Sequence, residues 1–265
     1  MKMNGYCTLI TGASAGIGQE FARQLAPRAG SLVLVARRLD RLETLRDELI
    51  AANPSREVRV RQCDLADIAQ VDALTRWLQA ERISVDLLIN NAGLGDRGAF
   101  LTSDPRRVQE MTMVNIVALT RLTRALLPAM VERKRGGILN VSSSASFLPM
   151  PTFAVYAATK AYVTSFTEAL RAELRGTGIA VCALCPGPVL TEFGEVAGRP
   201  GETYDSGPAF THVAVEQVVS NAIAALEADR PIVVPGLAMK IGMTIVRLTP
   251  MPLLRFAAGF AAKRR

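Results

Sequence analysis

Residues 6–18 read "YCTLITGASAGIG", and this stretch decides the fold. A short apolar run leads into Gly12, Gly16 and Gly18, and the amphipathic run 16–28 follows. A glycine turn between a strand and a helix lets backbone N–H groups and the helix N-terminus approach a phosphate. The spacing G-x-x-x-G-x-G departs from the common dinucleotide pattern G-x-G-x-x-G, and an ordinary tight turn is the alternative interpretation. The strand–turn–helix position favours phosphate binding.

The same alternation of strand and helix continues along the chain. Strands are expected at 6–10, 31–36, 57–62, 85–90, 137–143, 179–184 and 231–234. Helices are expected at 16–28, 40–52, 67–82, 105–132, 153–175 and 215–228. The pattern predicts an α/β fold, with a Rossmann-like, doubly wound parallel sheet of about seven strands. We expect one domain, with a catalytic body at 1–235 and a C-terminal helical extension at 236–265; ligands then bind at the carboxyl ends of the strands.

Composition and charge exclude several classes of protein. The chain has 265 residues, of which 49% are hydrophobic and 21% charged, so a sizeable core can form. The first 229 residues contain 24 basic and 24 acidic residues, so the net charge of +7 arises after Asp229. Since the body is balanced and aromatic residues make up only 5%, no nucleic-acid partner is expected. The opening "MKMNGYCTLITG" lacks a signal-peptide pattern, which favours a cytoplasmic protein.

Two of the four cysteines, Cys182 and Cys185, form a C-x-x-C pair. They lie in an expected strand, where residues three apart point to opposite faces of the sheet. The chain has no second C-x-x-C, and the single histidine, His212, belongs to another segment. We therefore expect buried, reduced thiols and predict no metal site.

The residues after the second expected strand indicate which nicotinamide cofactor fits. At this place an acidic residue binds the ribose 2′-OH of NAD, whereas an arginine accommodates the 2′-phosphate of NADP. Here Arg37 and Arg38 follow the strand, and the nearest acid, Asp40, lies at the start of the next helix. NADP(H) is the predicted cofactor, with solvated surface charge as the alternative for both arginines.

Seven motifs, in order, resemble the classical short-chain dehydrogenase/reductase family over residues 5–235. They are "TGASAGIG" (11–18), "CDL" (63–65), "NNAG" (90–93), Asn115, Ser143, "YAATK" (156–160) and "PGPVLT" (186–191). The resemblance implies an NADP(H)-dependent oxidoreductase that transfers a hydride between nicotinamide and a carbonyl or secondary alcohol. The expected partner is thus a small-molecule substrate.

The resemblance also implies a role for each residue of the catalytic set. Tyr156 would be the general acid that protonates the carbonyl oxygen. Lys160 lies one helical turn away, lowers the phenol pKa through its charge, and holds the ribose hydroxyls. Ser143, thirteen residues before the tyrosine, would hold the substrate oxygen, and Asn115 would fix a water beside Lys160.

Further residues are implied to contact the cofactor. Asp64 and Leu65 match the position near the adenine ring, and the segment 186–191 matches the grip on the nicotinamide carboxamide. Ala15 stands where many NADP-preferring relatives carry a basic residue, so phosphate recognition rests on Arg37 and Arg38. The full set is Gly12, Ser14, Ala15, Gly16, Ile17, Gly18, Arg37, Arg38, Asp64, Leu65, Asn91, Ala92, Gly93, Tyr156, Lys160, Pro186, Gly187, Val189 and Thr191.

Substrate selection is expected in the Gly- and Pro-rich segment 192–212, which suits a mobile lid. Its large hydrophobic residues are Phe193, Val196, Tyr204 and Phe210. An apolar wall is assigned to Leu94, Phe147, Met150, Pro151 and Phe153, although core packing would explain these residues equally well. The pattern names no substrate.

The extension 236–265 contains no acid, and two short helices are expected at 237–248 and 253–262. Pro250 and Pro252 interrupt it, and a spanning helix needs about 20 apolar residues, so it does not span a bilayer. An apolar stripe comprises Leu237, Ile241, Ile245 and Leu248. The stripe either packs on the protein's own core or a dimer partner, or lies on an anionic membrane, facing lipid-like ketones of 3-oxoacyl or steroid type.

Two further expectations concern the whole chain. Helices 105–132 and 153–175 are apolar on more than one side, and in the family such helices pair across a two-fold axis, so a homodimer is expected. A non-catalytic, cofactor-binding regulatory protein is the alternative to an enzyme. The intact Ser143, Tyr156 and Lys160 argue against it.

Overall fold

The computed structural model describes residues 2–199 and 211–263, and in them one parallel sheet is the centre of the molecule. The strand order is β3-β2-β1-β4-β5-β6-β7. Sequence order reverses between β1 and β4, and ligands of doubly wound sheets bind beside such a reversal. The strands are β1 Cys7–Thr11, β2 Ser31–Ala36, β3 Glu57–Gln62, β4 Leu87–Asn90, β5 Gly136–Val141, β6 Ile179–Leu184 and β7 Ile232–Val233.

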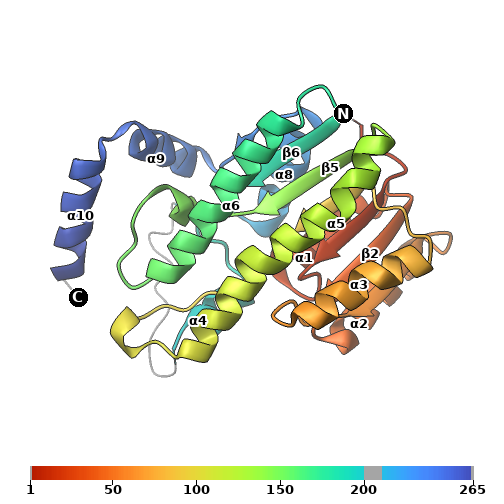
Figure 1. The fold of residues 1–265 in the computed structure, drawn as a ribbon, viewed down its shortest axis with the longest axis horizontal. Helices are drawn as coiled ribbons and strands as arrows, with labels where there is room; N and C mark the ends of the chain where they lie inside the picture. The colour runs from red at the N-terminus through yellow and green to blue at the C-terminus, as the bar shows by residue number, and fades with distance from the viewer. Residues whose placement is uncertain (1, 200–210, 264–265) are drawn as a thin grey trace.

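Helices cover both faces of the sheet, which confirms the predicted fold (Figure 1). One face carries α1 (Gly16–Leu25), α2 (Leu39–Ala52) and α8 (Val215–Glu227), whose apolar sides join one core cluster. The other face carries α3 (Ile68–Ala80), α5 (Leu119–Glu132) and α6 (Ala154–Glu173), which form a second cluster. Because both faces are covered, the inner strands β1, β2, β4, β5 and β6 are buried and need no polar alternation, whereas the edge strand β3 alternates valine with charged residues.

The helix expected at 105–132 is divided into three parts. It consists of α4 (Pro105–Thr112), a π-helical turn at Met113–Ala118, and α5. By length and composition alone this stretch is apolar enough to cross a membrane, and a buried core helix passes the same test. Its apolar side covers the sheet here. Wide turns of this kind are frequent at functional positions.

The C-terminal extension forms two helices, α9 (Leu237–Leu248) and α10 (Met251–Lys263). They meet at an angle of 115°, so they are not one straight span. The expectation that the apolar stripe packs on the protein's own core is wrong, because Leu237 is 74% and Leu248 79% exposed. Instead Met239, on another side of α9, turns inward and is 9% exposed. Figure 1 shows α10 standing out from the body of the molecule.

Candidate active site

The glycine turn after β1 is shaped by backbone that only glycine adopts easily. Gly12 and Gly16 have φ of +66° and +54°. A Cβ on Gly12 would lie 2.9 Å from the Cα of Ala92, in the turn after β4. The Thr11 hydroxyl joins the two turns, since it accepts from the backbone N–H groups of Asn91 (3.0 Å) and Ala92 (3.1 Å). The carboxyl ends of β1 and β4 are thereby held together.

Gly18 lies beneath this turn and is not part of the described cavity wall, and its contact with the cofactor stays a prediction. A Cβ on Gly18 would lie 2.3 Å from the Gly12 carbonyl oxygen and 2.4 Å from Asn91 Nδ2. The missing side chain therefore lets α1 pack closely under the turn.

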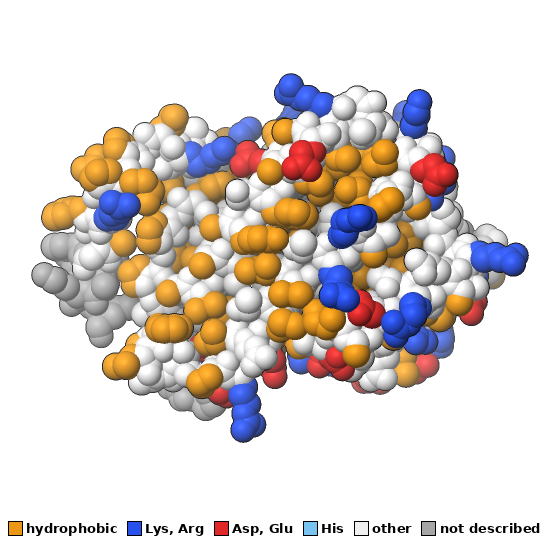
Figure 2. Space-filling view, in the orientation of Figure 1, with side chains coloured by type: hydrophobic (Ala, Val, Ile, Leu, Met, Phe, Trp, Pro, Cys, Tyr) orange, Lys and Arg blue, Asp and Glu red, His pale blue; other side chains and the backbone are white. Residues whose placement is uncertain are grey.

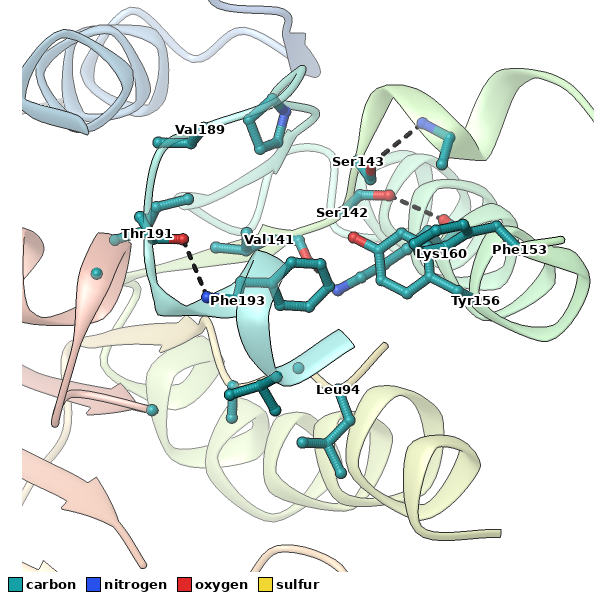
Figure 3. Close-up of a pocket in the computed structure, with 18 of the residues that line it drawn as sticks. Leu94, Val141, Ser142, Ser143, Phe153, Tyr156, Lys160, Val189, Thr191 and Phe193 are labelled. Atoms are coloured by element: carbon teal, nitrogen blue, oxygen red, sulfur yellow. Dashed lines mark hydrogen bonds between the residues drawn. The ribbon is translucent and has the colours of Figure 1, made fainter. Parts of the chain in front are cut away.

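Tyr156 and Lys160 lie one turn apart on α6 and face the same space (Figure 3). The Lys160 ammonium lies 5.8 Å from the Tyr156 ring centroid and donates to the Val141 carbonyl at 2.8 Å. Burial lowers the pKa of Lys160 to about 8, because desolvation disfavours the charged form. Across the cavity, the Phe193 ring lies 5.5 Å from the Tyr156 ring.

The neighbouring residues Ser142 and Ser143, which follow β5, make different hydrogen bonds. Ser142 is buried, and its hydroxyl donates to the Lys160 carbonyl at 2.8 Å and pairs with Thr164. Ser143 begins a 3-10 turn at Ser144–Phe147, where its Oγ accepts from the Ala145 N–H at 3.1 Å. Among the described contacts this oxygen only accepts, so its O–H is available to donate to a group that enters the cavity. The structure thus places Ser143 on the cavity wall, and its contact with a substrate oxygen stays a prediction.

Asn115 is buried behind the cavity, on the π-helical turn, and does not form part of its wall. Its Nδ2 donates to the Leu94 carbonyl and to Thr159 Oγ1, both at 2.9 Å, while its Oδ1 accepts from the Leu94 N–H. A Cβ on Gly93 would lie 3.2 Å from Lys160 Nζ and 3.5 Å from Asn115 Oδ1. Asn115 therefore braces the segment beside Lys160, and the water assigned to it stays a prediction.

The arginines after β2 lie at the rim of the cavity, together with a residue that the sequence analysis missed. Arg38 donates to Ser14 Oγ at 3.3 Å and to Glu192 at 2.9 Å. Arg41 reaches the other carboxylate oxygen of Glu192 at 2.5 Å. These hydrogen bonds from Arg38 and Arg41 hold the pKa of Glu192 below its usual range. The Arg37 side chain makes no ion pair with a described residue.

These residues surround one cavity of about 950 Å³. Except for Gly18 and Asn115, it brings every predicted site residue together. The wall includes Gly12, Ser14, Ala15, Gly16, Ile17, Arg37, Arg38, Asp64, Leu65, Asn91, Ala92, Gly93, Ser143, Tyr156, Lys160, Pro186, Gly187, Val189 and Thr191.

The remaining wall is largely apolar. Leu94, Met150, Pro151 and Phe153 lie on it as expected, whereas Phe147 instead packs 5.5 Å from the Arg247 guanidinium. Phe193 and Val196 belong to α7 (Glu192–Ala197), a helix that the sequence did not predict. Tyr204 and Phe210 lie outside the described residues. The sequence analysis also missed three residues of α10, namely Leu254, Ala257 and Ala258.

The C-x-x-C thiols lie apart on the two faces of the sheet. Cys182 belongs to the core cluster beside α1 and α8, and Cys185 contacts Thr164 of α6 at 3.8 Å. Burial raises the pKa of Cys182 to about 12 and that of Cys185 to about 11, so both are protonated near neutral pH. In the described part of the chain, no cluster of His, Cys, Asp and Glu side chains is arranged to hold a metal.

Comparison with known proteins gives consistent matches. A sequence model described as "short chain dehydrogenase" matches residues 6–199. The NADP-dependent 3-hydroxy acid dehydrogenase YdfG of Salmonella typhi is 35% identical over 223 residues, covering 80% of this chain and 86% of that protein. A short-chain dehydrogenase from Sphingobium yanoikuyae, solved in complex with NADPH, has a TM-score of 0.81 and 32% identity, with 92% and 94% of the chains covered. A Burkholderia phymatum relative, solved with NAD, has a TM-score of 0.80 and 27% identity, with 92% and 93% covered.

Proposed function

Because the chain belongs to the short-chain dehydrogenase family and is an oxidoreductase, we propose that it transfers a hydride between NADP(H) and a carbonyl or secondary alcohol. One observation carries this proposal. Tyr156, Lys160 and Ser143 open into the cavity that also contains the glycine turn and the arginine rim. A proton donor, a buried cation and a hydroxyl donor thus meet beside a phosphate-binding turn.

The residues present fit a nicotinamide dinucleotide. Side chains on Gly12 or Gly93 would collide with or crowd neighbouring atoms, so backbone forms these parts of the cavity wall. The helix α1 begins at Gly16, and its N-terminal N–H groups favour a pyrophosphate at this end of the cavity. When bound, the nicotinamide supplies or accepts the hydride.

The chain's own residues would handle the proton and the substrate oxygen. The Ser143 hydroxyl donates a hydrogen bond that positions the carbonyl oxygen. The Tyr156 hydroxyl gives that oxygen its proton during reduction and takes it back during oxidation. The Lys160 ammonium favours the phenolate that reduction leaves behind, because an opposite charge stabilises it. Phe153 and Phe193 lie 5.3 Å and 5.5 Å from the Tyr156 ring and keep water away from it.

The preference for NADP(H) is supported by the charges at the rim. Arg37 and Arg38 follow β2, and a guanidinium binds a phosphate better than a ribose hydroxyl. The relatives include complexes with NADPH and with NAD, so the family alone does not determine the cofactor. We expect NADPH to be preferred by about one to three powers of ten in kcat/KM, and Arg37→Asp to reverse the order. Equal use of both cofactors by the unmodified protein would contradict this assignment.

A turnover screen tests the proposed activity. NADPH oxidation is followed with ketosteroids, 3-oxoacyl thioesters, quinones, short aldehydes and sugars, in parallel for the protein and for Tyr156→Phe. We expect turnover that the variant loses by roughly 10²–10⁴-fold, since it lacks one proton donor. NADPH binding, measured by fluorescence, is expected to be retained because the ring remains. NADPH binding without turnover of any substrate would instead favour the alternative of a non-catalytic, cofactor-binding regulatory protein.

A further inference from the structure

The outer side of α9 and α10, called here the C-terminal arm, exposes a concentration of large apolar side chains. It provides seven of the twelve exposed large hydrophobic residues in the described part of the chain. An exposed apolar patch of this kind marks an interaction surface. The seven are Leu237, Ile241, Ile245 and Leu248 of α9, and Met251, Leu253 and Phe256 of α10. Figure 2 shows hydrophobic side chains gathered over both helices on one face of the molecule.

The charges on the arm have one sign. Between 237 and 259 the charged residues are Lys240, Arg247 and Arg255, and the printed sequence contains no acid after Asp229. Arg247 lies 3.7 Å from Glu168 on α6, whereas Lys240 and Arg255 make no ion pair with a described residue. Apolar area and unneutralised basic charge therefore occupy the same surface, and an anionic apolar partner complements both.

The arm is fastened to the body at α9. Met239 packs against Gly187, where an added Cβ would lie 2.9 Å from the Met239 side chain. Arg247 lies over the Phe147 ring at 5.5 Å. The two helices meet at an angle of 115°, and each of them exposes large apolar side chains. Neither helix is long enough to cross a bilayer, which needs about 20 apolar residues.

We propose that the C-terminal arm binds the surface of an anionic lipid bilayer. Amphipathic helices with basic residues lie in the membrane interface through buried apolar area and attraction to anionic lipids. A second copy of this chain fits less well, since a two-fold contact of the arm with itself would bring basic residues of both copies together. The proposal thus selects the partner by charge as well as by apolar area.

The inner side of the same arm connects the membrane to the cavity. Leu254, Ala257 and Ala258 lie on the cavity wall, while Leu253 and Phe256 face outward. An arm lying on a bilayer brings the part of the cavity wall that α10 forms close to the lipid interface. Given the proposed function, the substrates are therefore apolar ketones dissolved in the membrane, with a long chain or fused rings.

Vesicle flotation of the full chain tests the binding surface without any substrate. The vesicles contain phosphatidylcholine alone or an equimolar mixture with phosphatidylglycerol. We expect flotation with the anionic vesicles only. Ile241→Ser with Phe256→Ser should abolish it, and Lys240→Glu with Arg255→Glu should weaken binding by roughly tenfold or more, because each basic residue contributes to binding.

Matched controls remove equal apolar area or charge elsewhere on the surface. Phe100→Ser with Leu101→Ser, at 64% and 95% exposure, and the double variant Arg106→Glu with Arg175→Glu should leave flotation unchanged. All these side chains are exposed, so circular dichroism should show folded variants. The proposal is overturned if the full chain does not float, if neutral vesicles bind equally well, or if the arm variants only convert a dimer to a monomer in light scattering.

A second measurement separates this proposal from the catalytic one. Ile241→Ser with Phe256→Ser is assayed on a short aldehyde in solution and on a long-chain ketone dissolved in the anionic vesicles. We expect unchanged turnover of the aldehyde and at least a tenfold loss on the ketone. An equal rate on both substrates would overturn delivery from the membrane. Flotation of the unmodified protein without turnover of the aldehyde or the ketone would refute the proposed function. The proposal that the C-terminal arm binds lipid would remain supported.

Discussion

Lys160 keeps an ammonium group almost entirely out of water, at 4% exposure, with the Val141 carbonyl as a neutral acceptor. Burial without an acidic partner explains why its pKa falls to about 8. Below that pH the side chain is charged and supports the Tyr156 phenolate, and above it the support is lost. We therefore expect kcat/KM for carbonyl reduction to decline as the pH rises through about 8.

NMR of the cofactor-free protein with isotope-labelled lysine checks the cause of that decline. The chain contains five lysines, and Lys160→Met identifies the signal of Lys160. This signal should titrate near pH 8. A Lys160 signal that does not change as the pH passes through about 8 would contradict the assignment.

Single glycines offer a second test at the residue scale. Gly18→Ala should lower the free energy of unfolding by about 1–3 kcal/mol, because the added carbon would lie 2.3 Å from the backbone oxygen of Gly12. Gly242→Ala, within α9, meets nothing within 4 Å and should raise the free energy by up to about 1 kcal/mol through helix propensity. Urea denaturation measures both variants. Equal effects would show that helix propensity, not the close approach of α1, governs position 18.

At the scale of elements, α7 is joined to the start of α2 through Glu192, which pairs with both Arg38 and Arg41. In the proposed function, this carboxylate would compete with the 2′-phosphate of NADP(H) for the Arg38 guanidinium. Exposed ion pairs are weak, so Glu192→Gln should tighten NADPH binding by only about two- to fivefold and leave NADH binding unchanged. Fluorescence titration measures both dissociation constants. Glu195→Gln, on the same helix, is the control, and an equal gain there would argue against competition at Arg38.

Several strands could be predicted from the sequence because the residue patterns that form them are local. The bounds of β2, β3 and β6 were predicted correctly. β2 and β6 are nearly continuous apolar runs, and in β3 Val58 and Val60 alternate with charged residues, which is the period of a strand. The end of β5 was not, because Ser143 leaves the sheet only where its side chain caps a 3-10 turn. The π-helical turn depends on hydrogen bonds of Asn115 to Leu94, which are 21 residues apart, and therefore escaped prediction.

The candidate site shows the same division. Motifs such as 11–18 and 156–160 were assigned through the family resemblance. The fold brings residues of both motifs to the wall of one cavity. Gly18 and Asn115 were expected among the site residues but support the cavity from behind. Ala257 and Ala258 were missed because alanine has neither a polar group nor a large side chain that would indicate a place on the cavity wall. Only the 115° corner between α9 and α10 brings them there.

On the scale of the whole molecule, the outer face of α6 suits contact with a second copy. Its exposed residues include Ala154, Ala158, Ala161 and Ser165, which leave room for close helix packing. We expect a homodimer across α5 and α6 at micromolar concentration, and Ala161→Glu should convert it to a monomer by placing a charge in the contact. Light scattering measures the mass. Ala51→Glu, on α2 beyond the opposite face of the sheet, is the control, and a monomeric unmodified protein would refute the expectation.

The contact between Met239 and Gly187 links α9 to the segment 186–191, and α10 also forms part of the wall of the same cavity. Met239 occupies the space that a side chain on Gly187 would need, so α9 cannot move toward this segment without displacing it. A ligand that shifts α9 and a ligand that orders residues 186–191 would therefore share one coupling free energy. Thermodynamic reciprocity requires that each changes the affinity of the other by the same factor. A cofactor bound at one end of the cavity would then change the affinity of α9 for an interface, and binding at the interface would change the affinity for the cofactor.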